Sequence, residues 1–184
     1  MGTDRKLRHD GFRRLSLTLA ILLCAGTARA DSDAMASFRF RGMPLGTEYR
    51  EFVRRYPGAT FLGDQSQERM GLKIYFATIS DVADGAKFSF LDERLFQIEI
   101  MYLPERLTKL GGLDSFAQKL RSAFGKPDDY KTFEQGFLTT WRRSDLNRYA
   151  YFGKTADAVV LSVCDTVPEA VLQSRRSRSA DFGF

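Results

Sequence analysis

Apolar and polar residues alternate along residues 87–103, whose sequence is KFSFLDERLFQIEIMYL. Phe88 and Phe90 lie two positions apart, and the same spacing recurs in Phe96, Ile98, Ile100 and Tyr102. A period of two places successive side chains on opposite faces of a strand. Asp92 and Glu93 separate the two apolar runs, where a tight turn is expected. The pattern predicts a β-hairpin with an apolar face toward a core and a polar face toward water.

Two other segments have the period of an amphipathic helix. In residues 45–58, one helical face is formed by Tyr49, Phe52, Val53 and Tyr56. Thr47 is placed to cap the start of this helix, and Pro57-Gly58 ends it. In residues 113–124, the apolar stripe consists of Leu113, Phe116, Ala117, Leu120 and Phe124. Both segments are predicted to be helices that pack on the sheet.

Further strands are predicted at residues 38–41, 72–79, 137–143, 148–152 and 158–164, with connections at residues 59–71 and 105–112. Each helix is then followed by about three strands, which suggests two α-β-β-β pseudo-repeats at about residues 38–104 and 111–166. The expected fold class is α+β, with an antiparallel sheet of six to seven strands and two helices on one face.

The first thirty residues have the pattern of a secretory signal peptide. A basic start precedes the apolar run at residues 15–26, and Ala28-Arg29-Ala30 supplies the small residues that precede a cleavage site. The apolar run is shorter than the roughly 20 residues that span a bilayer. A twin-arginine route through Arg13-Arg14 and lipid attachment at Cys24 are the alternatives. The chain is expected to be exported to the periplasm or the cell exterior.

Removal of this peptide changes the charge and the available chemistry. The whole chain has 28 basic and 23 acidic residues, and residues 1–30 contain six and two of them, which leaves 22 against 21. A near-neutral chain lacks the charge that drives nucleic-acid binding. The single histidine, His9, also leaves, which excludes catalysis by Ser-His-Asp or Cys-His groups. Cys164 then has no partner for an intramolecular disulfide, and is predicted to be a buried strand residue.

The remaining 184 − 30 = 154 residues suffice for one domain, predicted at residues 31–172. Residues 173–184, QSRRSRSADFGF, are rich in serine and arginine and have no apolar period. They are predicted to form a mobile basic tail.

The sequence contains few groups that suggest a reaction. Asp92-Glu93 and Asp128-Asp129 are adjacent acids, which we interpret as solvated surface residues, although a hydrolase needs only two suitably placed carboxyl groups. We predict no catalytic residue, no metal and no cofactor. The candidate binding residues are Trp141, Arg142, Arg143, Tyr149 and Tyr151, because Trp, Tyr and Arg are favoured at binding hot spots. A core position for Trp141 is the alternative.

The helix that ends in Phe124-Gly125-Lys126-Pro127, and the strand with Trp141 that follows it, resemble the α-β-β unit of BamE/SmpA-like envelope lipoproteins. The doubled unit is similar to the tandem-repeat fold of the β-lactamase inhibitor proteins. This resemblance covers about residues 45–166. It implies a domain that binds other proteins and is not an enzyme.

The sequence is therefore compatible with three functions. The first is a non-catalytic module that binds another protein of the cell envelope, or has a structural role there. The second is a binder of a lipid, a peptide or a glycan fragment, which predicts a cavity lined by Phe52, Phe88, Phe90 and Ile98. The third is a hydrolase. The oligomeric state is left open, and no transmembrane helix is expected after residue 30.

Overall fold

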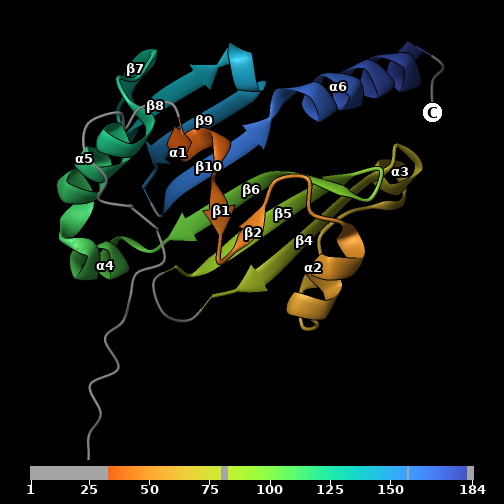
Figure 1. The fold of residues 1–184 in the computed structure, drawn as a ribbon, viewed down its shortest axis with the longest axis horizontal. Coiled ribbons are helices and arrows are strands. Elements are labelled where there is room, and N and C mark those ends of the chain that lie inside the picture. Colours follow the sequence, from red (N-terminus) through yellow and green to blue (C-terminus); the bar gives the residue numbers. More distant parts are fainter. Residues whose placement is uncertain (1–32, 80–82, 157, 182–184) are drawn as a thin grey trace, which may run out of the picture.

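The computed structural model describes residues 33–79, 83–156 and 158–181 (Figure 1). The predicted signal peptide lies outside the described residues. Eight strands form one antiparallel sheet in the order β3-β4-β5-β6-β10-β9-β8-β7. Their bounds are β3 (Thr60–Phe61), β4 (Leu72–Thr78), β5 (Gly85–Leu91), β6 (Arg94–Tyr102), β7 (Asp129–Phe133), β8 (Gly136–Arg143), β9 (Arg148–Lys154) and β10 (Val159–Asp165). Two meanders thus meet where β6 pairs with β10, and β3 and β7 are the edges of the sheet.

The predicted central hairpin is confirmed. Strands β5 and β6 pair along their length, and Leu91 lies opposite Arg94 across a two-residue turn. Asp92 and Glu93 in this turn have φ values of 48° and 66°. Left-handed φ at both central residues is the type I′ geometry, which matches the twist of the strands but favours Asn-Gly or Asp-Gly. Two non-glycine residues therefore hold a conformation that costs backbone free energy.

Glycine at position 93 is expected to be more stabilising than alanine. Both Glu93→Gly and Glu93→Ala remove the 2.5 Å ion pair with Lys73, so the difference between them isolates the backbone. We expect the glycine variant to have the larger free energy of unfolding by about 1 kcal/mol, since only alanine retains the Cβ clash. Urea unfolding of both variants measures this difference. Equal midpoints would contradict the left-handed conformation of residue 93.

Both predicted long helices are confirmed, as α2 (Tyr49–Arg55) and α5 (Gly112–Phe124). The predicted cap of the first is wrong, because Glu48 is the N-cap residue and the Thr47 hydroxyl instead donates to the Pro44 carbonyl at 2.7 Å. Val53 is 39% exposed, so it lies at the margin of the apolar face.

Several short elements occupy segments predicted as connections. Residues 59–71 contain β3 and α3 (Gln65–Arg69), which begins with a capping box between Asp64 and Gln67. Residues 105–112 contain most of α4 (Pro104–Leu107) and the 3-10 helix η1 (Thr108–Leu110). Before α2, helix α1 (Asp33–Ala36) precedes a two-stranded sheet of β1 (Arg39–Phe40) and β2 (Met43–Pro44). A second 3-10 helix, η2 (Ser144–Leu146), joins β8 to β9.

The α+β class and the large antiparallel sheet are confirmed, but the predicted strand number and repeat design are wrong. The sheet has eight strands, and α2 is followed by β3, α3 and three longer strands, whereas α5 is followed by four strands. The two missed strands lie at the edges. β3 has two residues, and all five residues of β7 are exposed, so neither shows an apolar alternation.

The tail predicted at residues 173–184 is corrected in its secondary structure, because its described residues are helical; residues 182–184 lie outside the described part of the chain. Residues Thr166–Asp181 form helix α6, which extends away from the end of β10 (Figure 1). Leu172 is its buried residue among those whose side chains are described, and it packs against Leu72, Leu91, Phe96 and Cys164. A helix that buries so little apolar surface gives no periodic signal.

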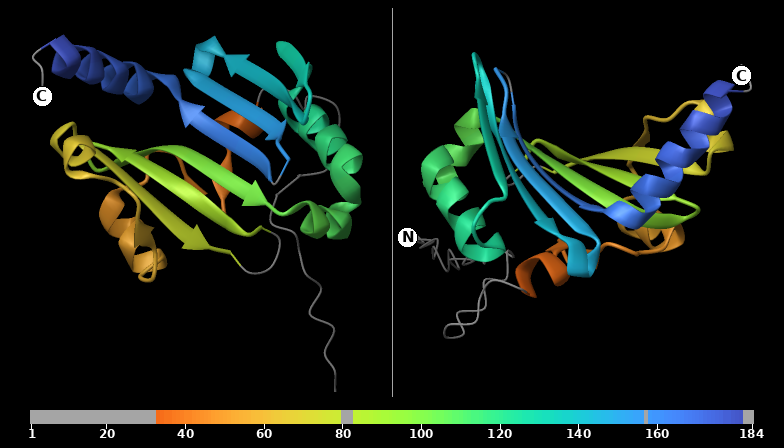
Figure 2. Two further views of the ribbon diagram at one scale, coloured as in Figure 1. Left: turned by 180° about the vertical axis from the view of Figure 1, so that it is seen from behind. Right: turned by 90° about the horizontal axis from the view of Figure 1, so that it is seen from above.

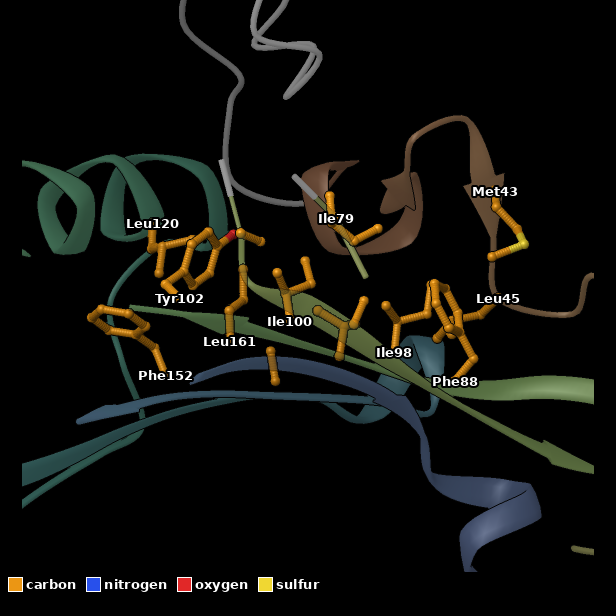
Figure 3. Packing of buried hydrophobic residues seen from close by; sticks show 14 of the residues in the cluster. Met43, Leu45, Ile79, Phe88, Ile98, Ile100, Tyr102, Leu120, Phe152 and Leu161 are labelled. Atoms are coloured by element: carbon orange, nitrogen blue, oxygen red, sulfur yellow. The ribbon is translucent and has the colours of Figure 1, made fainter. Parts of the chain in front are cut away.

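One core lies between the sheet and helices α2 and α5. The Phe52 ring of α2 packs at 5.0 Å from the rings of both Phe88 and Phe90. Phe116 of α5 packs at 5.1 Å from Tyr102 and 5.5 Å from Phe152. In Figure 3 the labelled strand side chains project toward α1, α5 and β2, whereas α6 begins beyond the other side of the strands. Both predicted helices therefore cover one face, which we call the helix face.

The other side of the sheet, which we call the open face, carries the intervening strand residues. Its central positions include Lys87, Ser89, Gln97, Glu99, Thr140, Arg142, Tyr149, Tyr151 and Ser162. Figure 2 shows α5 and α6 on opposite sides of the sheet. Among the described helices, α6 is the one that packs on the open face, and its buried contact there is confined to the cluster around Leu172.

Candidate functional site

The register of β8 and β9 separates the five predicted binding residues. Arg142 lies opposite Tyr149, and Thr140 lies opposite Tyr151, so Arg142 and both tyrosines belong to the open face. Trp141 lies opposite the buried Ala150 and therefore points to the helix face. The prediction of Trp141 as a binding residue beside the two tyrosines is wrong, because a one-residue offset along a strand reverses the face.

Trp141 is a core residue. Its indole is buried and meets the Phe124 ring edge-on at 5.6 Å. Its Nε1 donates to the Gly125 carbonyl at 3.0 Å, so the buried polar atom is satisfied. Gly125 has a φ of 84° where α5 ends, and the indole therefore joins the end of this helix to the middle of β8. The alternative interpretation of Trp141 as a core residue holds.

Arg143 is placed at the end of β8, beside η2. Its Nε and Nη2 donate to the two carboxylate oxygens of Asp145 at 2.9 and 2.6 Å. Hydrogen bonding by Arg143 lowers the pKa of the Asp145 carboxyl. This bidentate pair orders the β8–β9 turn, and it lies away from the centre of the open face.

A row of polar side chains crosses the middle of the open face, which we call the central row. Register places Lys87 opposite Glu99, Glu99 opposite Ser162, and Ser162 opposite Tyr151 on four adjacent strands. Glu99 accepts hydrogen bonds from both sides. Its Oε1 lies 2.6 Å from Lys87 Nζ, and its Oε2 accepts from the Tyr151 hydroxyl at 2.6 Å. One carboxylate thereby joins two side chains whose strands are separated by β6 and β10.

The protonation state of Tyr151 follows from this geometry. Burial raises the pKa of the Tyr151 phenol, and its hydrogen bond to Glu99 raises it further. The phenol therefore remains protonated near neutral pH and acts as a hydrogen-bond donor. Gln97 adds a further bond to the network, because its Nε2 donates to Ser162 Oγ at 3.2 Å. The central row is thus a rigid, internally bonded polar surface.

Arg142 and Tyr149 flank the central row. The Arg142 guanidinium lies 5.8 Å from the centre of the Tyr149 ring, a cation–π distance. The Arg142 backbone N–H donates to Asp128 Oδ2 at 2.5 Å. Arg142 is exposed and Tyr149 is half-buried. An aromatic ring beside a solvent-exposed guanidinium is a combination favoured at protein interfaces.

Cys164 lies opposite Tyr149 on the neighbouring strand β10, on the open face. It is a free, buried thiol, as predicted, and lies in the cluster under α6. Burial raises the pKa of the thiol, and the nearby Glu169 raises it further. Because the thiolate is the reactive form, burial and the raised pKa both lower the reactivity of this cysteine near neutral pH.

Helix α6 is attached to the far end of the open face by an ion pair. Arg175 donates to both carboxylate oxygens of Asp92, at 2.8 and 2.7 Å, and to the Met70 carbonyl at 2.6 Å. Hydrogen bonding by Arg175 lowers the pKa of Asp92 below its usual value. One helix is therefore bound to the turn of the central hairpin through a charged contact that acid removes.

Acid is expected to loosen α6. A carboxyl with a depressed folded-state pKa stabilises the docked helix above its unfolded pKa of about 4, and this contribution is lost as the pH falls through the folded value. The protection factors of residues 172–178 against hydrogen exchange, which are corrected for the intrinsic effect of pH, should decrease below about pH 4 in the wild type. Asp92→Asn should show the faster exchange already at pH 7, since asparagine tolerates the left-handed backbone but lacks the charge. Arg176→Gln, on the same helix, is the control. Identical exchange in Asp92→Asn and wild type would refute this role of Arg175.

The cavity predicted between Phe52, Phe88, Phe90 and Ile98 is filled. All four side chains are fully buried in one cluster, and the ring contacts at 5.0 Å occupy the space between them. A groove of about 610 Å³ lies elsewhere, between α5 and the β7–β8 hairpin. Leu113, Ala117, Tyr130 and Phe137 line it together with charged residues.

The predicted acid pairs have structural partners. Asp92 binds Arg175, Glu93 binds Lys73, and Asp128 accepts the Arg142 N–H. Among the described residues, no group of three or more His, Cys, Asp or Glu side chains is arranged to hold a metal ion.

Sequence reasoning missed the central row. Gln97 and Glu99 lie on the polar face of the predicted hairpin, but the sequence pattern predicts no bonding partner for them, nor any role for Lys87 and Ser162. The alternation along residues 87–103 indicates that Lys87, Gln97 and Glu99 share one face of the hairpin. Their alignment with Tyr151 depends on the pairing of β6 with β10 and of β10 with β9, which no local pattern predicts.

None of the helices in the described part of the chain is both long enough and apolar enough to cross a membrane. A scan against protein-family models, a search of curated proteins and a search of solved structures each found no match to this chain.

Proposed function

We propose that this chain is an exported, non-catalytic binding protein that holds another protein of the cell envelope against its open face. The observation that carries the proposal is the central row, Lys87, Glu99 and Tyr151, flanked by Arg142 and Tyr149. Lys87, Glu99 and Tyr151 are held by short hydrogen bonds before binding, so these three side chains lose little entropy when a partner docks. The predicted export signal and the resemblance to BamE/SmpA-like proteins and β-lactamase inhibitor proteins support the same role.

The chemistry of the surface favours binding over catalysis. Tyr151 keeps its proton and Cys164 keeps its proton, because burial raises the pKa of each. Glu99 already accepts two short hydrogen bonds. Arg142, Tyr149 and Lys87 can contact a partner protein on this surface. Because the donors and acceptors of the surface are already paired, it supplies no free base or nucleophile for a reaction.

The experiment compares capture of envelope proteins by the immobilised wild type and by the double variant Arg142→Glu, Tyr149→Ala. We expect the variant to lose at least about tenfold of the specifically captured partner, as for hot-spot residues. The stability of the variant should stay close to wild type because Arg142 is exposed and Tyr149 is half-buried. Val53→Ala, on α2 and away from the open face, is the matched control. Retention of the same partner by the double variant would overturn the proposal.

A further inference from the structure

Strand β7 is an uncovered edge of the sheet. It pairs with β8 on one side, and no described strand lies on its other side. All five of its residues are exposed, and Tyr130 and Phe133 expose 54% and 52% of their surface. An edge strand presents unpaired N–H and C=O groups that can add another strand. The exposed aromatic side chains would gain from such an addition, since their apolar surface would be buried.

The sequence of β7, DYKTF, is complementary to itself in one antiparallel register. When Tyr130 lies opposite Tyr130 of a second copy, Asp129 of each copy lies opposite Lys131 of the other. Two ion pairs then flank a pair of aromatic rings, and both arrangements stabilise neighbouring strands. When the copies slide so that Lys131 lies opposite Lys131, like charges meet. The opposite charges at positions 129 and 131 therefore favour this register over the registers centred on Asp129 or on Lys131.

The faces of the strand agree with this arrangement. Asp129 pairs with Thr140 and thus lies on the open face, whereas Tyr130 pairs with Thr139 on the helix face. Tyr130 also lines the groove of about 610 Å³ beside Leu113 and Ala117 of α5. In the paired copies, the two Tyr130 rings would meet next to both grooves. Charges and rings thus occupy separate sides of the joined strands.

We propose that two copies of this chain associate through β7 in this register, with eight strands from each copy in one continuous sheet. A twofold axis perpendicular to the sheet relates antiparallel copies, so both open faces lie on the same side of the dimer. Short, charged edge strands usually resist pairing. In β7 the two charges have opposite signs, so they disfavour the registers that place like charges opposite one another and complement this one. The inference does not rest on the proposed function.

The contact is small, which sets the concentration at which it forms. In this register only residues 129–131 of β7 lie directly opposite one another, and such a contact buries less than the roughly 1,200 Å² typical of a stable interface. We therefore expect dissociation in the range of about 10 to 100 μM rather than at nanomolar concentration. Analytical ultracentrifugation of the purified protein from about 5 to 500 μM covers this range.

Charge reversal tests the register directly. Asp129→Lys and Lys131→Asp should each weaken association at least tenfold, because like charges then face one another twice. The double swap, Asp129→Lys with Lys131→Asp, restores opposite charges and should return association to within about threefold of wild type. An equimolar mixture of the two single variants should form a heterodimer, since positions 129 and 131 are then both basic in one copy and both acidic in the other.

The mixture also separates association from folding. The exposed pair between Asp129 and Lys131 of one copy, at 3.2 Å, is lost in each single variant. Mixing does not restore that internal pair, so association of the mixture reports only contacts between copies. Circular dichroism confirms that each variant is folded. A monomeric wild type at about 500 μM, or single variants that associate as well as the swap, would overturn the proposal.

Discussion

Replacement of Phe52 by alanine is expected to lower the free energy of unfolding by about 3–5 kcal/mol, the range for a phenylalanine lost from a packed core. The Phe52 ring is fully buried and contacts five other rings, those of Tyr49, Tyr56, Tyr75, Phe88 and Phe90. Its removal would leave a cavity between α2 and the centre of β5 that rigid aromatic neighbours cannot fill. Chemical denaturation monitored by circular dichroism measures the change.

The neighbouring residue provides the control for this prediction. Val53 belongs to the same helix and is 39% exposed, so Val53→Ala should change the free energy of unfolding by no more than about 0.5 kcal/mol. Phe52→Leu retains part of the buried volume and should fall between the two. If Phe52→Ala lowered the free energy of unfolding by less than about 1 kcal/mol, α2 would not be packed tightly against the core, and a ligand could enter there.

Replacement of Trp141 by alanine should be destabilising by a similar amount, about 3–5 kcal/mol. The indole is buried against Phe124, and its Nε1 donates to the Gly125 carbonyl at 3.0 Å. Alanine removes the packing and leaves the carbonyl without this partner, which destabilises the end of α5 as well as β8. Trp141 is the only tryptophan of the chain, so the variant has no tryptophan fluorescence with which to follow unfolding. Thermal unfolding is therefore measured by circular dichroism.

Two further substitutions separate packing from surface recognition. Trp141→Phe retains an aromatic ring but loses the hydrogen bond, and should lower the free energy of unfolding by about 1–3 kcal/mol. Tyr149→Ala, on the next strand and on the open face, should be far less destabilising. If Trp141→Ala had the same free energy of unfolding as the wild type but no longer captured the partner, the indole would belong to a binding surface. The placement of Trp141 in the core would then be wrong.

Local patterns in the sequence predicted the interior of the fold well. The strict alternation around Phe88 and Ile98 identified the central hairpin, and the helical spacing of Phe116 and Leu120 identified α5. Such periods persist because one face of each element is buried in a single core. The elements that were missed bury little. All residues of β7 are exposed, and α6 is held by Leu172 and the Arg175–Asp92 pair, so neither leaves a periodic apolar trace.

The candidate site was only partly accessible from sequence for a different reason. Arg142, Tyr149 and Tyr151 were identified by residue type, but their grouping on one face depends on the register between β8 and β9. Glu99 lies 52 residues before Tyr151, and the two meet only because β6 pairs with β10, which pairs with β9. A local sequence pattern cannot predict a contact between β6 and β9, because these strands are brought together only through β10, which follows both of them in the sequence.

The most direct test of the open face as a binding surface is photo-cross-linking in the cell envelope. A benzophenone amino acid replaces Tyr149 in one preparation and Val53, on the helix-covered side, in another. A binding role of the open face predicts a discrete adduct with another envelope protein from position 149 and none from position 53. Adducts from position 53 alone, or no adduct from position 149, would contradict it.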